Sequence, residues 1–101
     1  MKSNVYQLSE IAEKDLEDIF DYTHQEFGLD QAILYVLSFN EVFTMISQNP
    51  KLGIDRNEIK KGLKSFVYKS HIIFYRTMKN NVRIVRVLHG SRDLPRHLKS
   101  V

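Results

Sequence analysis

The sequence predicts a single α+β domain in which an antiparallel sheet is packed on one face by a helical hairpin. Two observations lead to this class. Apolar residues recur at helical spacing through residues 10–48, and three strand-like segments follow within residues 63–89. The predicted order is β-α-α-β-β-β. A chain of 101 residues buries enough surface for one modest core, so we expect one domain over residues 1–101.

The first strand and the first helix are expected within residues 3–27. Residues 3–8 alternate as a short strand does, and Ser9 suits the N-cap position of the helix that follows. Gly28 suits the positive-φ position that ends a helix. Acidic side chains fall on the face opposite the apolar stripe, which consists of Ala12, Leu16, Ile19, Phe20, Thr23 and Phe27.

A second helix is expected from an N-cap at Asp30 to Gln48, where Asn49-Pro50 stops it. A link of two or three residues forces the helices to lie antiparallel. From their stripes we expect a core that contains Leu16, Ile19, Phe20, Phe39, Val42, Phe43 and Ile46.

The strands are predicted over residues 63–68, 71–77 and 82–89, with turns at Lys69-Ser70 and Asn80-Asn81. Apolar residues run almost unbroken in the last two strands, so apolar side chains must lie on both faces of the sheet. The hairpin covers one face. We expect the other face to form an apolar groove, ringed by Arg and Lys, that receives another chain, unless residues 94–101 fold back over it.

Charge is divided unevenly along the chain. Residues 1–50 hold two basic and nine acidic residues, a net charge of −7, whereas residues 51–101 hold thirteen basic and three acidic residues, a net charge of +10. The basic half therefore favours an anionic target or an acidic partner. The absence of cysteine is typical of a reducing cytoplasm, and no stretch reaches the ~20 apolar residues of a membrane helix.

The histidines do not show the spacing of a metal site, and we expect neither a metal nor another cofactor. One catalytic hypothesis, RNA cleavage through the 2′-hydroxyl, needs a base, an acid and cations on one sheet face. Regular alternation puts Arg83 and His89 on one face and Arg86 on the other. Histidines at strand ends are more often structural, so we assign no catalytic residue. The candidates for this chemistry are His89 or Glu58 as base, Tyr75 or His71 as acid, and Arg83 or Arg86 as cation.

Five short strings carry a family resemblance that spans nearly the whole chain. They are DLEDI at 15–19, NPKLG at 49–53, GLKSF at 62–66, HIIFY at 71–75 and IVRVLHGSRD at 84–93. Together with the element order they resemble the ParE/RelE superfamily of bacterial toxin–antitoxin toxins, and within it the ParE branch. One departure is Lys64, where ParE-like sequences usually have Arg.

The resemblance implies a toxin that binds DNA gyrase and blocks replication without hydrolysing a substrate or binding a specific nucleic-acid sequence. It also implies a ParD-like antitoxin that wraps a C-terminal segment, often acidic and amphipathic, around the toxin. The RelE branch, which consists of ribosome-dependent mRNA endonucleases, is the alternative.

Candidate contact residues follow from the charge and the strand pattern. We expect the target to meet the basic C-terminal region, namely Arg86, His89, Arg92, Arg96 and Lys99. We expect the antitoxin to meet residues on strands whose second face lacks an obvious cover, namely Phe66, Tyr68, Ile73, Tyr75 and Arg83.

Overall fold

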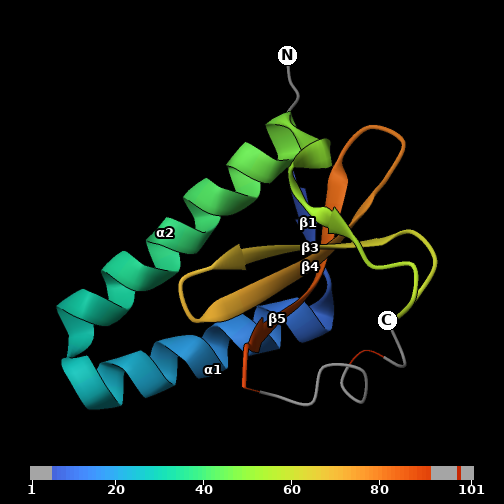
Figure 1. The fold of residues 1–101 in the computed structure, drawn as a ribbon. Coiled ribbons are helices and arrows are strands. Elements are labelled where there is room, and N and C mark those ends of the chain that lie inside the picture. Colours follow the sequence, from blue (N-terminus) through green and yellow to red (C-terminus); the bar gives the residue numbers. More distant parts are fainter. Residues whose placement is uncertain (1–5, 92–97, 99–101) are drawn as a thin grey trace.

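The computed structural model describes residues 6–91 and Leu98. Figure 1 shows two helices on one side of a sheet, joined at a tip that projects beyond the strands. The predicted α+β class and the predicted element order are confirmed, with one further short strand after the helices. The elements are β1 (Tyr6–Leu8), α1 (Glu10–Phe27), α2 (Leu29–Gln48), the 3-10 turn η1 (Pro50–Leu52), β2 (Ile54–Asp55), β3 (Leu63–Tyr68), β4 (His71–Thr77) and β5 (Val82–His89).

The sheet has five strands in the order β1-β5-β4-β3-β2. All neighbouring pairs are antiparallel except β1 and β5, which run parallel with Tyr6 opposite Val82. The sheet is therefore mostly antiparallel. Its one parallel pair joins the first strand to the last.

The helix ends show which local predictions hold. Ser9 caps α1 as predicted, since its side chain accepts a hydrogen bond from the Ala12 N–H at 3.0 Å. Gly28, with φ of +95°, ends α1 and also starts α2, where its carbonyl accepts from the Ala32 N–H at 3.1 Å. The link is thus a single residue. The prediction of Asp30 as N-cap is wrong, because Asp30 already lies in the first turn of α2.

Two cores lie on the two faces of the sheet. Within the main core, between the hairpin and the sheet, Ile19, Phe39, Val42, Phe43 and Ile46 are buried as predicted, whereas Leu16 packs at its margin and Phe20 is only half-buried. The opposite face of the sheet holds a second core. The prediction of an open groove on this face is wrong, because Leu98 of the C-terminal segment is fully buried there. The second core consists of Leu63, Phe74, Val85, Leu88 and Leu98, with Ile59 and Ile72 packed against it.

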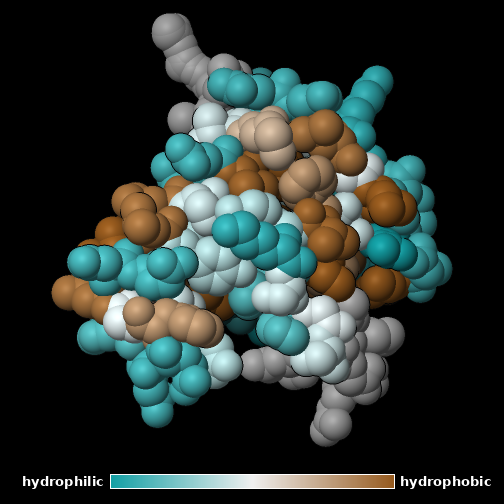
Figure 2. Space-filling model, turned by 60° about the vertical axis from the view of Figure 1, so that its left-hand side comes forward, coloured by the Kyte–Doolittle hydropathy of each residue, from teal (hydrophilic) through white to brown (hydrophobic). Residues whose placement is uncertain are grey.

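Large apolar side chains also remain exposed on the helices. Tyr22 and Phe27 lie on the distal part of α1, and Leu34 and Leu37 lie on α2. Seen from the side on which the hairpin tip projects, the surface carries brown apolar patches between teal polar ones (Figure 2). The hairpin therefore carries several large exposed apolar residues, and others, such as Ile54 and Val67, lie on β2 and β3.

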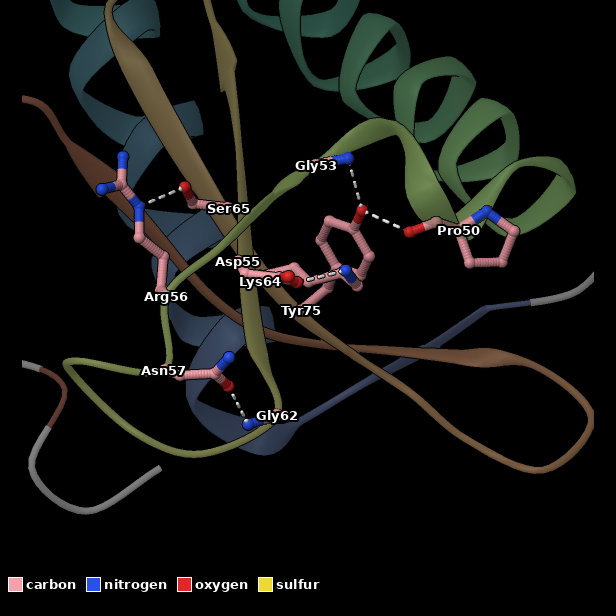
Figure 3. Close-up of polar contacts among 9 residues, drawn as sticks. All are labelled: Pro50, Gly53, Asp55, Arg56, Asn57, Gly62, Lys64, Ser65 and Tyr75. Atoms are coloured by element: carbon pink, nitrogen blue, oxygen red, sulfur yellow. Dashed lines mark hydrogen bonds and ion pairs between the residues drawn. The ribbon is translucent and has the colours of Figure 1, made fainter.

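Tyr75 fastens the segment that follows α2 to the sheet (Figure 3). Its hydroxyl accepts from the Gly53 N–H at 2.8 Å and donates to the Pro50 carbonyl oxygen at 2.7 Å. A Cβ atom at position 53 would come within 2.8 Å of the Ser65 carbonyl oxygen, so glycine is required for this close approach. β2 can therefore pair with β3, an arrangement that the polar sequence of residues 51–61 did not predict.

We expect Tyr75→Phe to destabilise the fold by about 1–3 kcal/mol, because two backbone groups lose their hydrogen-bond partner in a buried setting. The free energy of unfolding in urea measures the loss. Tyr22→Phe, which removes the hydroxyl of an exposed tyrosine on α1, is the matched control. Equal stability of the two variants would contradict this role of Tyr75.

Candidate functional site

Asp15 anchors α1 to β5. Its carboxylate accepts from Nε and Nη2 of Arg86, both at 2.9 Å, and from the Val87 N–H, also at 2.9 Å. Only 10% of the Asp15 side chain and 13% of the Arg86 side chain are exposed. The hydrogen bond with Asp15 raises the pKa of Arg86. Arg86, chosen as a candidate target contact, therefore presents little of its side chain to a partner, since its guanidinium is held against α1.

An irregularity in β5 changes which side chains share a face. Phe74 lies opposite Arg86 and Tyr75 lies opposite Ile84, so Val85 is an extra residue between these pairs. Beyond this bulge the alternation is reversed. His89 lies on the hairpin side, against His71, whereas Arg83 sits between two residues of the main core and faces the opposite side. The prediction that Arg83 and His89 share a face is wrong for this reason.

A cleft of about 950 Å³ opens between the distal part of the hairpin and the adjoining ends of β4 and β5. His71 and His89 are directly paired across these strands, with ring centroids 5.4 Å apart. The sequence analysis missed this pair, although an antiparallel connection always places the first residue of one strand beside the last residue of the next. The cleft is lined by Asp18, Thr23, Tyr35, Lys69, His89 and Ser91, among others.

A chain of hydrogen bonds orients the polar groups of the cleft. The Tyr35 hydroxyl and Nδ1 of His71 lie 2.9 Å apart. Burial raises the pKa of Tyr35, and a hydrogen bond from the Ser70 side chain partly offsets this effect. The Ser91 N–H donates to Nδ1 of His89 at 3.2 Å.

Burial, and then the neighbouring His89, lower the pKa of His71 to about 4, so His71 is neutral near pH 7. The Lys69 ammonium lies 5.5 Å from the ring centroids of Tyr35 and of Tyr68. The cleft thus combines a neutral imidazole, an aromatic wall and an exposed lysine. Such a surface suits the binding of a polar or acidic side chain.

The other candidate residues differ in how accessible they are. Ile73 and Tyr75 are fully buried in the main core, so the reason for choosing them, an uncovered face, is wrong. Phe66 and Tyr68 are half-buried against that core, and Arg83 is half-buried on the opposite face. His89 is exposed at the rim of the cleft. Arg92, Arg96 and Lys99 lie outside the described residues.

Among residues 6–91 and Leu98, no three His, Cys, Asp or Glu side chains gather as a metal site requires. Within the same part of the chain, no helix has the length and apolar character needed to cross a membrane.

The fold defines a class of protein. A solved structure described as "Chromosomal ParDE TA system from P. aeruginosa" has the same fold, with a TM-score of 0.73 at 19% sequence identity, covering 86% of this chain and 98% of that chain. A family model described as "ParE toxin of type II toxin-antitoxin system, parDE" matches residues 6–94.

Sequence relatives agree with this class. Toxin ParE1 of Mycobacterium tuberculosis (strain H37Rv) is 36% identical over 97 residues, which cover 95% of this chain and 99% of that protein. Toxin ParE1 of Caulobacter vibrioides is 36% identical over 93 residues, which cover 92% of this chain and 96% of that protein. The chain belongs to the ParE toxin family of type II toxin–antitoxin systems.

We expect the stability of this protein to fall as the pH drops from 6.5 to 4. The pKa of His71 is about 4 in the folded chain and 6.5 in the unfolded chain, so between these values the unfolded chain binds the additional proton. The contribution of neutral His71 is complete above pH 6.5 and is lost as the pH falls through this window.

Urea unfolding of the protein and of His71→Phe, at several pH values between 4 and 7.5, measures this contribution. We expect the unsubstituted protein to lose about 1–2 kcal/mol more than the variant over the window, a figure reduced for solvent screening. Parallel pH profiles of the two proteins would contradict the prediction, because His71 would then have the same pKa in the folded and unfolded chains.

Proposed function

We propose that this chain, a ParE toxin of a type II toxin–antitoxin system, binds DNA gyrase, blocks the enzyme and so arrests replication, and that a ParD-like antitoxin neutralises it. The family supports the toxin role. The net charge of +10 in residues 51–101 supports a macromolecular target that carries negative charge. The proposal implies that the toxin acts in the cytoplasm.

The contacts of the candidate catalytic groups support binding over hydrolysis. The Tyr75 hydroxyl is hydrogen-bonded to the backbone of Gly53 and Pro50, and the Arg86 guanidinium is hydrogen-bonded to Asp15. Arg83 lies on the face opposite His89. Of the groups considered for RNA cleavage, Tyr75 and Arg86 are thus hydrogen-bonded within the fold, and Arg83 points away from His89.

The proposed target surface starts at the end of β5. His89 is exposed there, and the chain continues directly into the segment that contains Arg92, Arg96 and Lys99. Lys69, beside the same cleft, adds a cation. For the antitoxin we retain Phe66, Tyr68 and Arg83, which are half-buried and so present part of their side chains to a partner.

Purified gyrase tests the proposal. We expect this protein to inhibit ATP-dependent supercoiling of relaxed plasmid, and we expect His89→Ala to need about tenfold more protein, which corresponds to about 1.4 kcal/mol of lost binding. His24→Ala, an exposed histidine on α1, is the matched control and should inhibit like the unsubstituted chain. Unimpaired supercoiling at high molar excess of the toxin would refute gyrase as the target.

A second candidate function, ribosome-dependent mRNA cleavage of the RelE type, draws support from one observation. The pairing of His71 with His89, close to Lys69, brings two imidazoles and a cation to one cleft. Cleavage of mRNA in a translating extract, lost in a folded His89→Ala variant, would favour this function. We expect intact mRNA.

A further inference from the structure

We propose that Arg76 and Arg83, the arginine pair, bind a phosphate group of duplex DNA at one end of the sheet. The inference rests on the proposed function for the source of this DNA, because the duplex would be the one that gyrase holds while the toxin is bound to it. A contact with a phosphate carries no sequence information, so the site agrees with the expectation that the chain binds no specific nucleic-acid sequence. Arg83 is also a proposed antitoxin contact, so the antitoxin and the DNA would compete for this side chain.

The arginine pair joins two neighbouring strands. Arg76 on β4 and Arg83 on β5 lie directly opposite each other, and both are half-buried. Both side chains point to the second face of the sheet, because their chain neighbours Tyr75, Val82 and Ile84 pack into the main core on the first face. The Cβ atoms of directly paired residues lie about 5 Å apart, so two positive charges meet at close range. Like charges in this position destabilise a sheet, and an anion bound by both guanidinium groups would remove the repulsion.

The segment before β3 holds the guanidinium of Arg76 in place. Nη1 of Arg76 donates to the Lys61 carbonyl oxygen at 2.8 Å, and a Cβ atom at Gly62 would come within 3.2 Å of the same nitrogen. Arg83 forms no ion pair within residues 6–91 and Leu98. Its neighbour on β1, Gln7, is exposed and adds a polar side chain beside it. One guanidinium is thus fixed in position, and the other is available to an anionic ligand.

The carboxylates of the described chain do not neutralise the arginine pair. Residues 51–91 contain ten basic and two acidic residues, a net charge of +8. Both acidic residues form ion pairs elsewhere, Asp55 with Lys64 (Figure 3) and Glu58 with Arg56. The other acidic residues of the described chain belong to α1 and α2, which lie on the first face of the sheet, whereas the arginine pair points to the second face (Figure 1). The positive charge of the pair is therefore left for a ligand.

Further cations at the same end of the sheet favour duplex DNA over an isolated phosphate ion. The antiparallel register brings the start of β3, the end of β4 and the start of β5 together. Lys60 and Lys61 lie just before β3, and Lys79 lies in the turn between β4 and β5. A group of cations that extends beyond the arginine pair suits the repeated phosphates of a nucleic-acid backbone, whereas a free phosphate would need the pair alone.

Fluorescence anisotropy of a labelled duplex of about 20 base pairs, titrated with the full chain at several salt concentrations, tests the proposal. We expect the duplex to bind, and we expect the logarithm of the binding constant to fall linearly with the logarithm of the salt concentration, because phosphate contacts release counterions. Two duplexes of unrelated sequence should bind equally, since the site contacts the backbone and not the bases.

Variants that each remove one charge locate the site. We expect Arg76→Gln and Arg83→Gln each to weaken DNA binding about fivefold and to reduce the salt slope by about one, because each removes one phosphate contact. Lys14→Gln, which removes an exposed cation from α1 on the other side of the sheet, is the matched control and should change neither quantity. Urea unfolding shows whether the variants are folded. Arg83→Gln should be at least as stable as the unsubstituted chain, because it relieves the repulsion within the pair.

Three results would overturn the proposal. The first is equal DNA affinity of Arg83→Gln and Lys14→Gln, which would show general attraction of the basic chain. The second is release of the duplex by millimolar inorganic phosphate at constant ionic strength, which would indicate a site for free phosphate. The third is tighter binding of a Glu-rich peptide than of the duplex, which would indicate an acidic protein as the ligand.

None of these measurements contains gyrase, so they separate this inference from the proposed function. A chain that inhibits supercoiling without binding the duplex would refute the inference and leave the proposed function standing. A chain that binds the duplex through the arginine pair without inhibiting supercoiling would support the phosphate site and refute gyrase as the target.

Discussion

The position of the hairpin on the sheet depends on the buried carboxylate of Asp15. Three hydrogen bonds at 2.9 Å join it to the side chain of Arg86 and to the backbone of Val87, so one residue of α1 holds two consecutive residues of β5. Ser9, one turn and a half earlier, donates to the carbonyl of Val85 at 3.0 Å. The first half of α1 is thus tied to β5 on both sides of Arg86, while the distal half of the hairpin is left to stand away from the sheet and form the cleft.

The bulge in β5 determines which of its residues pack into which core. The extra residue Val85 packs into the second core, while Ile84 and Val87 pack into the main core. Without the bulge, strict alternation would turn His89 away from the hairpin, and the cleft would lose the imidazole that pairs with His71. The local irregularity of β5 therefore determines which side chains line the cleft.

Local patterns in the sequence predicted the elements well, and long-range contacts not at all. The spacing of apolar residues predicts the helices, and capping preferences predict their ends at Ser9 and Gly28. Both kinds of signal depend on residues that are close in the sequence. Asp15 looks like one more acidic residue of a solvated helix face, and nothing local shows that its partners are Arg86 and Val87. The bulge at Val85 and the short β2 likewise depend on partners far along the chain. For the site, the strand segments could be predicted but their faces and partners could not, so Arg86, Ile73 and Tyr75, which were chosen as contacts, lie buried within the fold.

Asp15 and Arg86 act together to hold the hairpin on β5. A double-mutant cycle with Asp15→Asn and Arg86→Gln, followed by urea unfolding, tests it most directly. We expect each single variant to lose about 2–4 kcal/mol, because each leaves a buried group without its charged partner. We expect the double variant to lose about 1–3 kcal/mol less than the two single losses combined. Additive losses would contradict the claim, since the two side chains would then stabilise the fold independently.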